Sequence, residues 1–208
     1  MKHPLFARIY ARVRPTLDRA GATDHRRRLL AGAAGRVVEV GAGDGGNFAH
    51  YPPEVSHVLA VEPEPFLRTQ ALRQASTAPV PVEVVEGTAD GLPAGDASAD
   101  VVVVSLVLCS VPDQRVALAE ARRVLRPGGE LRFYEHVAAE PGRLATFQQI
   151  ADATLWPLFT GGCHTHRDTA AAISAAGFAI EELDRFTFPP DRVTPAGPHI
   201  LGRARLTA

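Results

Sequence analysis

Apolar positions along the chain recur with two different periods, one typical of strands and one typical of helices. Short runs rich in β-branched residues have the length of buried strands and alternate with stretches of helical spacing. The predicted strands are residues 36–40, 58–62, 82–87, 100–106 and 130–137, with a turn at 126–129 before the last of them. Strands that alternate with helices, here at 63–76 and 114–125, predict a doubly wound, mostly parallel α/β sheet.

The first part of the chain precedes this alternation. Residues 3–17 and 23–35 have helical spacing, and Thr23 or Asp24 is the expected N-cap of the second helix. Phe6 and Tyr10 share the apolar side of the first helix with Leu5, Ile9 and Val13, so this side either faces a ligand or packs on the sheet. We expect residues 1–208 to form one domain, with the helices of 1–34 as a candidate lid.

The last part breaks the alternation. A helix is predicted over 165–177, opened by a capping box from Thr165 to Asp168. Two strands, 178–188 and 198–206, follow without a helix between them. Two successive strands predict an antiparallel hairpin at the sheet edge, which completes a seven-stranded sheet.

Composition and charge exclude several classes of protein. The formal net charge is −1, so no overall field attracts nucleic acid or an anionic membrane. The longest apolar run, residues 101–111, is too short to cross a bilayer, which predicts no integral membrane segment. Two cysteines do not make a disulfide framework and no signal peptide is evident, so a cytoplasmic setting is predicted. A monomer and a homodimer both stay open.

The stretch EVGAGDGGN, residues 39–47, follows the first predicted strand and carries two overlapping glycine patterns. One pattern, Gly41-x-Gly43-x-x-Gly46, fits a dinucleotide loop. The other, Gly41-x-Gly43-x-Gly45, fits the loop that binds S-adenosylmethionine (SAM). Either loop lies at the carboxyl ends of the strands, where backbone N–H groups reach a ligand. A tight turn that binds nothing is the simpler alternative.

Other features of the sequence bear on the choice between SAM and NAD, and together they favour SAM. Glu39 would repel a pyrophosphate but suits the ammonium of a methionyl group. Glu62 ends the second strand and can accept both ribose hydroxyls, which serves either cofactor; a surface carboxylate is the alternative. The closing hairpin resembles the reversed final strand of class I methyltransferases, and no Tyr-x-x-x-Lys pair exists because Lys2 is the sole lysine.

Longer motifs resemble one methyltransferase family. EVGAGDGGNFAHYP, LVLCSV, RVLRPGG, YEHVAAE and PHILG are similar to the alkyl thiol methyltransferases of animals, also called the methyltransferase-like 7 or thiol methyltransferase 1 family, and to bacterial relatives. The resemblance implies methyl transfer from SAM to sulfide or a small lipophilic thiol. The animal proteins begin with an apolar anchor that is not seen here, so we expect a soluble member of the bacterial branch. The loop GGCHTHRD also differs, at His164, which puts the acceptor in doubt.

The cofactor residues follow from the loop, the strand ends and the resemblance. We expect the methionyl part at Glu39, Gly41, Gly43 and Gly45, the ribose at Glu62, the adenine at Thr88, Ala89 and Asp90, and the sulfonium above Ser105 and Leu106.

The acceptor residues are expected after the fourth and fifth strands and in the loop before the last helix. Tyr10, Cys109, Trp156, Cys163 and His164 are the predicted substrate-binding residues. His136 is the predicted proton acceptor, because an unperturbed imidazole titrates near pH 6.5. Glu135 is the other catalytic candidate, since strand side chains alternate. Each of three residues also has a simpler alternative. His136 could bond only to backbone, Cys109 could be an ordinary buried residue, and Trp156 could be part of the core.

The grouping Cys163-His164-x-His166 raises the question of a metal. Zinc ligands usually come from more separated spacings, and His166 is expected inside the following helix, so no metal is predicted. The predicted function is SAM-dependent methyl transfer to a small molecule, most simply a thiol, with S-adenosylhomocysteine as product. O-, N- or C-methylation of a quinone, a phospholipid headgroup or a secondary metabolite stays open. A non-catalytic SAM-binding subunit is the alternative of another class.

Overall fold

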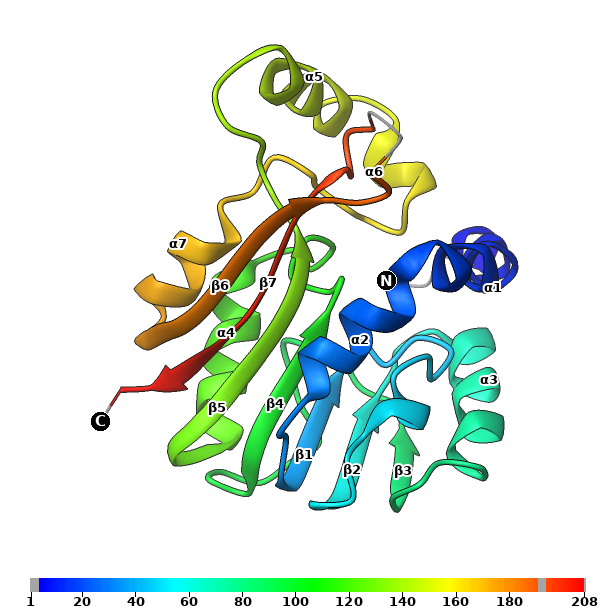
Figure 1. The fold of residues 1–208 in the computed structure, drawn as a ribbon, viewed down its shortest axis with the longest axis vertical. Coiled ribbons are helices and arrows are strands. Elements are labelled where there is room, and N and C mark those ends of the chain that lie inside the picture. The colour runs from blue at the N-terminus through cyan, green and yellow to red at the C-terminus, as the bar shows by residue number, and fades with distance from the viewer. Residues whose placement is uncertain (1–3, 191–193, 208) are drawn as a thin grey trace.

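The computed structural model describes residues 4–190 and 194–207, and seven strands in these residues form one sheet. The order across the sheet is β3-β2-β1-β4-β5-β7-β6. The strands are β1 (Gly35–Val40), β2 (Val55–Val61), β3 (Val82–Val85), β4 (Ala99–Ser105), β5 (Leu125–His136), β6 (Phe178–Thr187) and β7 (Pro198–Leu206). The first five pair in parallel, whereas β7 is antiparallel to both β5 and β6 (Figure 1). The predicted seven-stranded α/β sheet with an antiparallel C-terminal pair is confirmed.

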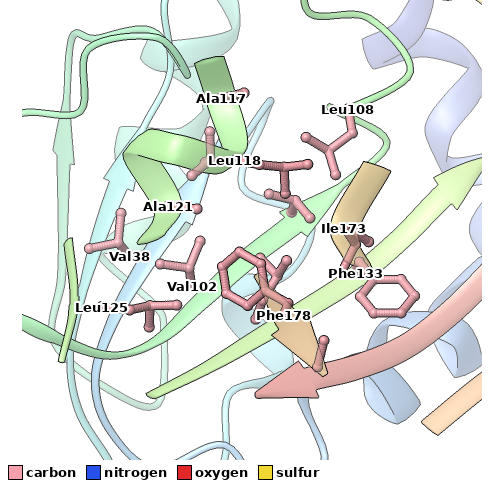
Figure 2. Packing of buried hydrophobic residues seen from close by; sticks show 14 of the residues in the cluster. Val38, Val102, Leu108, Ala117, Leu118, Ala121, Leu125, Phe133, Ile173 and Phe178 are labelled. Carbon is pink, nitrogen blue, oxygen red and sulfur yellow. The ribbon is translucent and has the colours of Figure 1, made fainter. Parts of the chain in front are cut away.

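Helices cover both faces of this sheet. They are α1 (Pro4–Leu17), a π-helical turn η1 (Asp18–Ala22), α2 (Thr23–Leu30), a 3₁₀ turn η2 (Phe48–His50), α3 (Pro65–Ala75), α4 (Gln114–Val124), α5 (Arg143–Asp152), α6 (Trp156–Phe159) and α7 (Thr169–Ala175). The alternation of side chains along β4 divides the core. Val102 packs with residues of α4 and α7 (Figure 2), and Val104 belongs to the same cluster. Val101 and Val103 pack with residues of α2 and α3 on the other face.

The N-terminal helices differ from the prediction. The chain passes from α1 to α2 through the turn η1, where Gly21 has φ 122°, and α2 begins at Thr23 without a side-chain cap. The expected cap by Thr23 or Asp24 was therefore wrong. Across the described residues no helix combines the length and the apolar character that a membrane crossing needs.

The last helix and the turn before β5 also differ from the prediction. Helix α7 begins at Thr169, and its N-cap is Asp168, which accepts from Ala171 N–H at 3.0 Å. Thr165 instead bonds Asp152, so the predicted capping box was wrong and His166 lies before the helix. The predicted turn at 126–129 lies within β5 as an irregularity, because the pairing with β4 jumps from Leu125 to Glu130.

Candidate active site

A cavity of about 630 Å³ lies where the parallel strands end. The residues that follow β1, β2 and β3 line one part of it, and the ends of β4 and β5 line another. Phe6 and Tyr10 of α1 also line it, so this side of the helix faces the cavity, while Leu5 is 63% exposed. The volume is in the range of small-molecule sites, and the carboxyl ends of the strands are where doubly wound sheets bind ligands.

The glycine loop after β1 lines the cavity with its backbone. Gly41 and Gly43 have φ of 64° and 59°, a region that favours glycine. A Cβ on Gly41 would lie 2.6 Å from a methyl carbon of Val107, so only glycine lets the two loops meet. Gly45, with φ 83°, does not line the cavity; a Cβ there would lie 2.8 Å from the Phe48 ring. Gly45 therefore allows the loop to pack closely against Phe48, on the side away from the cavity.

Glu39 lies under the same loop and does not line the cavity. Its carboxylate accepts hydrogen bonds from Asn47 at 2.9 Å and from the Tyr51 hydroxyl at 2.6 Å. Burial raises the pKa of Glu39 to about 7. Glu39 therefore anchors β1 to the end of the loop, and its contact with the methionyl ammonium stays a prediction.

Glu62 follows β2 and does line the cavity. One carboxylate oxygen accepts from Gly43 N–H at 2.7 Å and the other from Glu64 N–H at 2.8 Å. Burial raises the pKa of Glu62 to about 7. A carboxylate offers about four acceptor positions, so two remain for a ligand with paired hydroxyls. This is the group that a ribose needs.

The remaining predicted cofactor residues come together along the same cavity. Thr88, Ala89 and Asp90 follow β3, Ser105 ends β4 and Leu106 comes directly after it; all of these residues line the cavity. Leu106 has φ 60°, an uncommon conformation for leucine that turns the chain sharply at the strand end. A glycine loop, a carboxylate with free acceptor positions and the residues after β3 line one cavity of this volume, and this combination fits SAM.

Three side chains from distant segments meet at another part of the cavity. Cys109 comes from the loop after β4, His136 from the end of β5 and Cys163 from the loop before α7. His136 Nδ1 lies 3.5 Å from each of the two sulfurs. Trp156 lines the cavity as predicted, whereas His164 does not; its side chain is 39% exposed and 3.9 Å from Asp152.

These groups perturb one another. The contact with the Cys109 thiol, followed by the contact with the His136 ring, lowers the pKa of Cys163 against the effect of burial. Burial acts to lower the pKa of His136, yet the contact with Cys163 leaves that pKa above its ordinary value. The contact with Cys163, together with burial, raises the pKa of Cys109. Cys163 is therefore the more acidic of the two thiols.

Glu135 is fully buried and does not line the cavity. Its carboxylate accepts from the backbone N–H groups of Val107, Leu108 and Cys109 at 2.9, 3.0 and 3.1 Å. Burial raises the pKa of Glu135 to about 7. Of the two catalytic candidates, His136 faces the cavity and Glu135 holds the loop that carries Cys109.

Two further residues position the acceptor loops and carry no sequence signal that sets them apart. Arg167 donates to the carbonyls of Leu108 and Val111 at 2.8 and 2.7 Å. The fully buried Gln148 accepts from Ala139 N–H at 2.7 Å and donates to the carbonyls of three loop residues, which are Val137, Thr165 and Pro195. Both tie together loops that are far apart in the sequence.

His199 lies behind His136, with ring centroids 4.6 Å apart. Its Nδ1–H donates to the Gly197 carbonyl at 2.7 Å. Burial, followed by the nearby His136, lowers the pKa of His199 to about 3. The folded protein therefore keeps this ring neutral. The histidine of the unfolded chain takes up a proton below about pH 6.5, whereas the folded protein does not. The contribution of His199 to the free energy of unfolding is therefore fully present above that pH and is lost as the pH falls toward 3.

A His199→Phe variant tests this linkage. Between pH 7 and pH 5 we expect the free energy of unfolding of the wild type to fall by about 2 kcal/mol more than that of the variant, since one pKa unit is about 1.4 kcal/mol. Phenylalanine keeps the ring packing against Tyr134 and Phe186. Urea denaturation at the two pH values measures the difference, and equal pH dependence would contradict it.

Comparison with known proteins agrees with this geometry. A family model described as a methyltransferase domain matches residues 38–133. The chain is 40% identical over 181 residues to thiol S-methyltransferase TMT1B of Homo sapiens, covering 84% of this chain and 73% of that protein. It is 38% identical to human TMT1A over the same length, with the same coverage.

A solved structure shares the fold. A methyltransferase from Thermotoga maritima, described as a possible histamine N-methyltransferase, superimposes with a TM-score of 0.72. It is 23% identical, and the match covers 98% of this chain and 99% of that one. The chain therefore belongs to the SAM-dependent methyltransferases, in the family of the thiol S-methyltransferases TMT1A and TMT1B.

Proposed function

We propose that this methyltransferase transfers the methyl group of SAM to the sulfur of a small thiol. The observation that carries the proposal is the meeting of Cys109, His136 and Cys163 in the cavity that also contains Gly41, Gly43 and Glu62. The names of the human relatives, both thiol S-methyltransferases, support the same acceptor.

The chain's part in this reaction is alignment, exclusion of water and handling of one proton. Bound SAM supplies an electrophilic methyl group on a sulfonium. Phe6, Val111 and Trp156 give the cavity apolar walls, which suit a small lipophilic acceptor. A thiol of ordinary pKa, about 8.5, is only a few per cent thiolate at neutral pH. A polar group that removes the thiol proton is therefore useful but need not be a strong base.

His136 is the residue proposed to accept that proton. Its ring lines the cavity, and the neighbouring Glu135 has both carboxylate oxygens engaged by backbone N–H groups. We expect His136→Gln to lower kcat/KM for a thiol about 100-fold, the usual contribution of a general base, while the Kd for SAM is unchanged. His166→Gln, a change in the neighbouring loop outside the cavity lining, is the matched control and should leave both values unchanged.

The decisive assay measures release of S-adenosylhomocysteine with sulfide, aliphatic thiols, phenols, a quinol and amines as acceptors. Turnover with thiols supports the proposal. Turnover confined to phenols, quinols or amines would keep the cofactor and overturn the acceptor. Tight SAM binding without turnover of any acceptor would favour a non-catalytic SAM-binding subunit instead.

A further inference from the structure

We infer that Cys109, His136 and Cys163 form a zinc site whose open fourth position binds the acceptor thiol as a thiolate. This inference rests on the thiol acceptor of the proposed function, and it replaces the role of His136 as proton acceptor with that of a metal ligand. The three ligand atoms, two sulfurs and His136 Nδ1, lie within 4.8 Å of one another. Two thiolates and one imidazole are a ligand set typical of zinc, including catalytic zinc.

The distances match a tetrahedral site. With Zn–S of about 2.3 Å and Zn–N of about 2.0–2.1 Å, a sulfur and a nitrogen ligand lie about 3.6 Å apart. His136 Nδ1 is 3.5 Å from the sulfur of Cys109 and 3.5 Å from that of Cys163. The distances from this one nitrogen to both sulfurs therefore already match the separation of two ligand atoms around a tetrahedral zinc ion.

The ligands are held by supports that do not depend on a metal. Glu135 fixes the loop of Cys109 through three backbone N–H groups. The N–H of His164 donates to the carbonyl of Cys109 at 2.7 Å, which joins the loop of Cys163 to that of Cys109. Gly162 has φ 90° and lies so close that a Cβ there would be 3.0 Å from the Ser110 carbonyl oxygen. Such second-layer contacts are what orients metal ligands in proteins.

The fourth position is left open toward the cavity. In the part of the chain that the structure describes, no fourth His, Cys, Asp or Glu joins this group. Two carboxylates of the neighbouring loops are engaged elsewhere: Glu135 by backbone N–H groups, and Asp152 by Thr165 and by His166 N–H. All three ligands line the cavity that contains the glycine loop. Three protein ligands and an open position distinguish catalytic from structural zinc sites.

The reaction balances with zinc as a resident ion. The acceptor thiol displaces a bound water, loses its proton to solvent and binds the ion as a thiolate. The thiolate sulfur forms a bond to the methyl carbon as the bond from that carbon to the sulfonium sulfur breaks. The products are a thioether, S-adenosylhomocysteine and one proton, and water returns to the ion. With the ion bound, His136 Nδ1 is a ligand, and the metal takes over the lowering of the thiol pKa.

The test uses Co²⁺ as a spectroscopic probe on the full chain, reduced and freed of metal. We expect one Co²⁺ per chain with a thiolate-to-cobalt charge-transfer band that Zn²⁺ abolishes, and a change in the cobalt spectrum when an aliphatic thiol is added. Loss of a residue that only supports a metal ligand weakens metal binding by about 10–100-fold. Cys163→Ser removes a ligand itself, so it should weaken Co²⁺ binding by more than that. His166→Gln is the control and should bind as the wild type does. SAM binding by each variant reports that the fold is intact.

Other outcomes separate this inference from the proposed function. Absence of the charge-transfer band in reduced protein would overturn the zinc site, as would thiol turnover unaffected by a chelator; the second result would leave the proposed function standing. Ready formation of a Cys109–Cys163 disulfide without metal uptake would also overturn it. A further outcome combines two results: one Co²⁺ binds per chain but its spectrum does not change when a thiol is added, and the protein methylates only phenols or amines. This outcome would overturn both the binding of the acceptor thiol to the metal and the proposed function.

Discussion

Replacing Glu135 by alanine should lower the free energy of unfolding by about 3–5 kcal/mol. The N–H groups of Val107, Leu108 and Cys109 donate to this carboxylate, and Leu108 and Cys109 are buried residues. Without it they lose their acceptor, and each unsatisfied buried group costs about 1–3 kcal/mol. The loop that carries Cys109 is then free to leave the cavity wall. Urea denaturation measures the stability, and the reactivity of the Cys109 thiol reports the loop.

Two further variants separate support of the loop from catalysis. Glu135→Gln keeps one acceptor oxygen and loses the other, so we expect an intermediate loss of about 1–2 kcal/mol and substantial thiol turnover. A carboxylate that acted as the base would lose turnover equally in both variants. Glu83→Ala removes a carboxylate of β3 whose side chain is 62% exposed, and should change stability by no more than about 0.5 kcal/mol. Equal stability of Glu135→Ala and Glu83→Ala would contradict the assigned role.

The fold was predictable because its signals are local and repeated. Five short strand-like runs that alternate with stretches of helical spacing predict a parallel sheet, and two strands without a helix between them predict an antiparallel pair. Two errors lie at helix N-termini, where the chain offers several capping side chains within a few residues, and another lies at 126–129, where the predicted turn is an irregularity within β5. Thr165 and Asp168 are both good N-caps, and only the bond from Thr165 to Asp152, across the loop, decides between them.

Glu39 and Glu135 show why the direct contacts of the site were harder to predict. Both carboxylates follow apolar strand residues, and sequence gives their position along the strand but not the partners that satisfy them. Asn47 and Tyr51 bind Glu39, and backbone N–H groups bind Glu135. Both lie close to the ligand-binding loops without lining the cavity. Supporting and contacting residues carry the same chemistry in sequence, and only tertiary distance separates them.

The loop of Cys163 shows a limit of another kind. Strand order predicted that Cys109, His136 and Cys163 would lie together, and the structure brings these three side chains together. His164 was expected beside them, but it does not line the cavity. The loop turns at Gly161 and Gly162, both with positive φ, and His164 N–H then bonds the Cys109 carbonyl. A backbone turn thus selects which of the neighbouring side chains reaches the cavity, and no residue pattern within the loop encodes that choice.

The second large effect is expected at Glu62. Glu62→Ala should raise the Kd for SAM about 100-fold, because two hydrogen bonds to a charged group, each worth about 1.5–3 kcal/mol, are lost and are not fully additive. Isothermal titration with SAM measures this. Glu86→Ala is the matched control, since Glu86 follows β3, pairs with Arg68 and has a side chain that is 65% exposed; its Kd should equal that of the wild type.

The substitution Glu62→Gln refines the reason. Glutamine keeps one oxygen that can accept from Gly43 N–H or from the ribose. Its amide N–H₂ takes the place of the other oxygen and cannot accept a hydrogen bond from Glu64 N–H or from a ribose hydroxyl. An intermediate Kd is therefore expected. If the carboxylate served only to hold Gly43, the thermal stability of the ligand-free protein would fall with affinity in every variant. Ribose recognition instead predicts that the free energy of SAM binding changes by more than the free energy of unfolding of the ligand-free protein. A Glu62→Ala variant that binds SAM as tightly as the wild type would refute ribose recognition by Glu62.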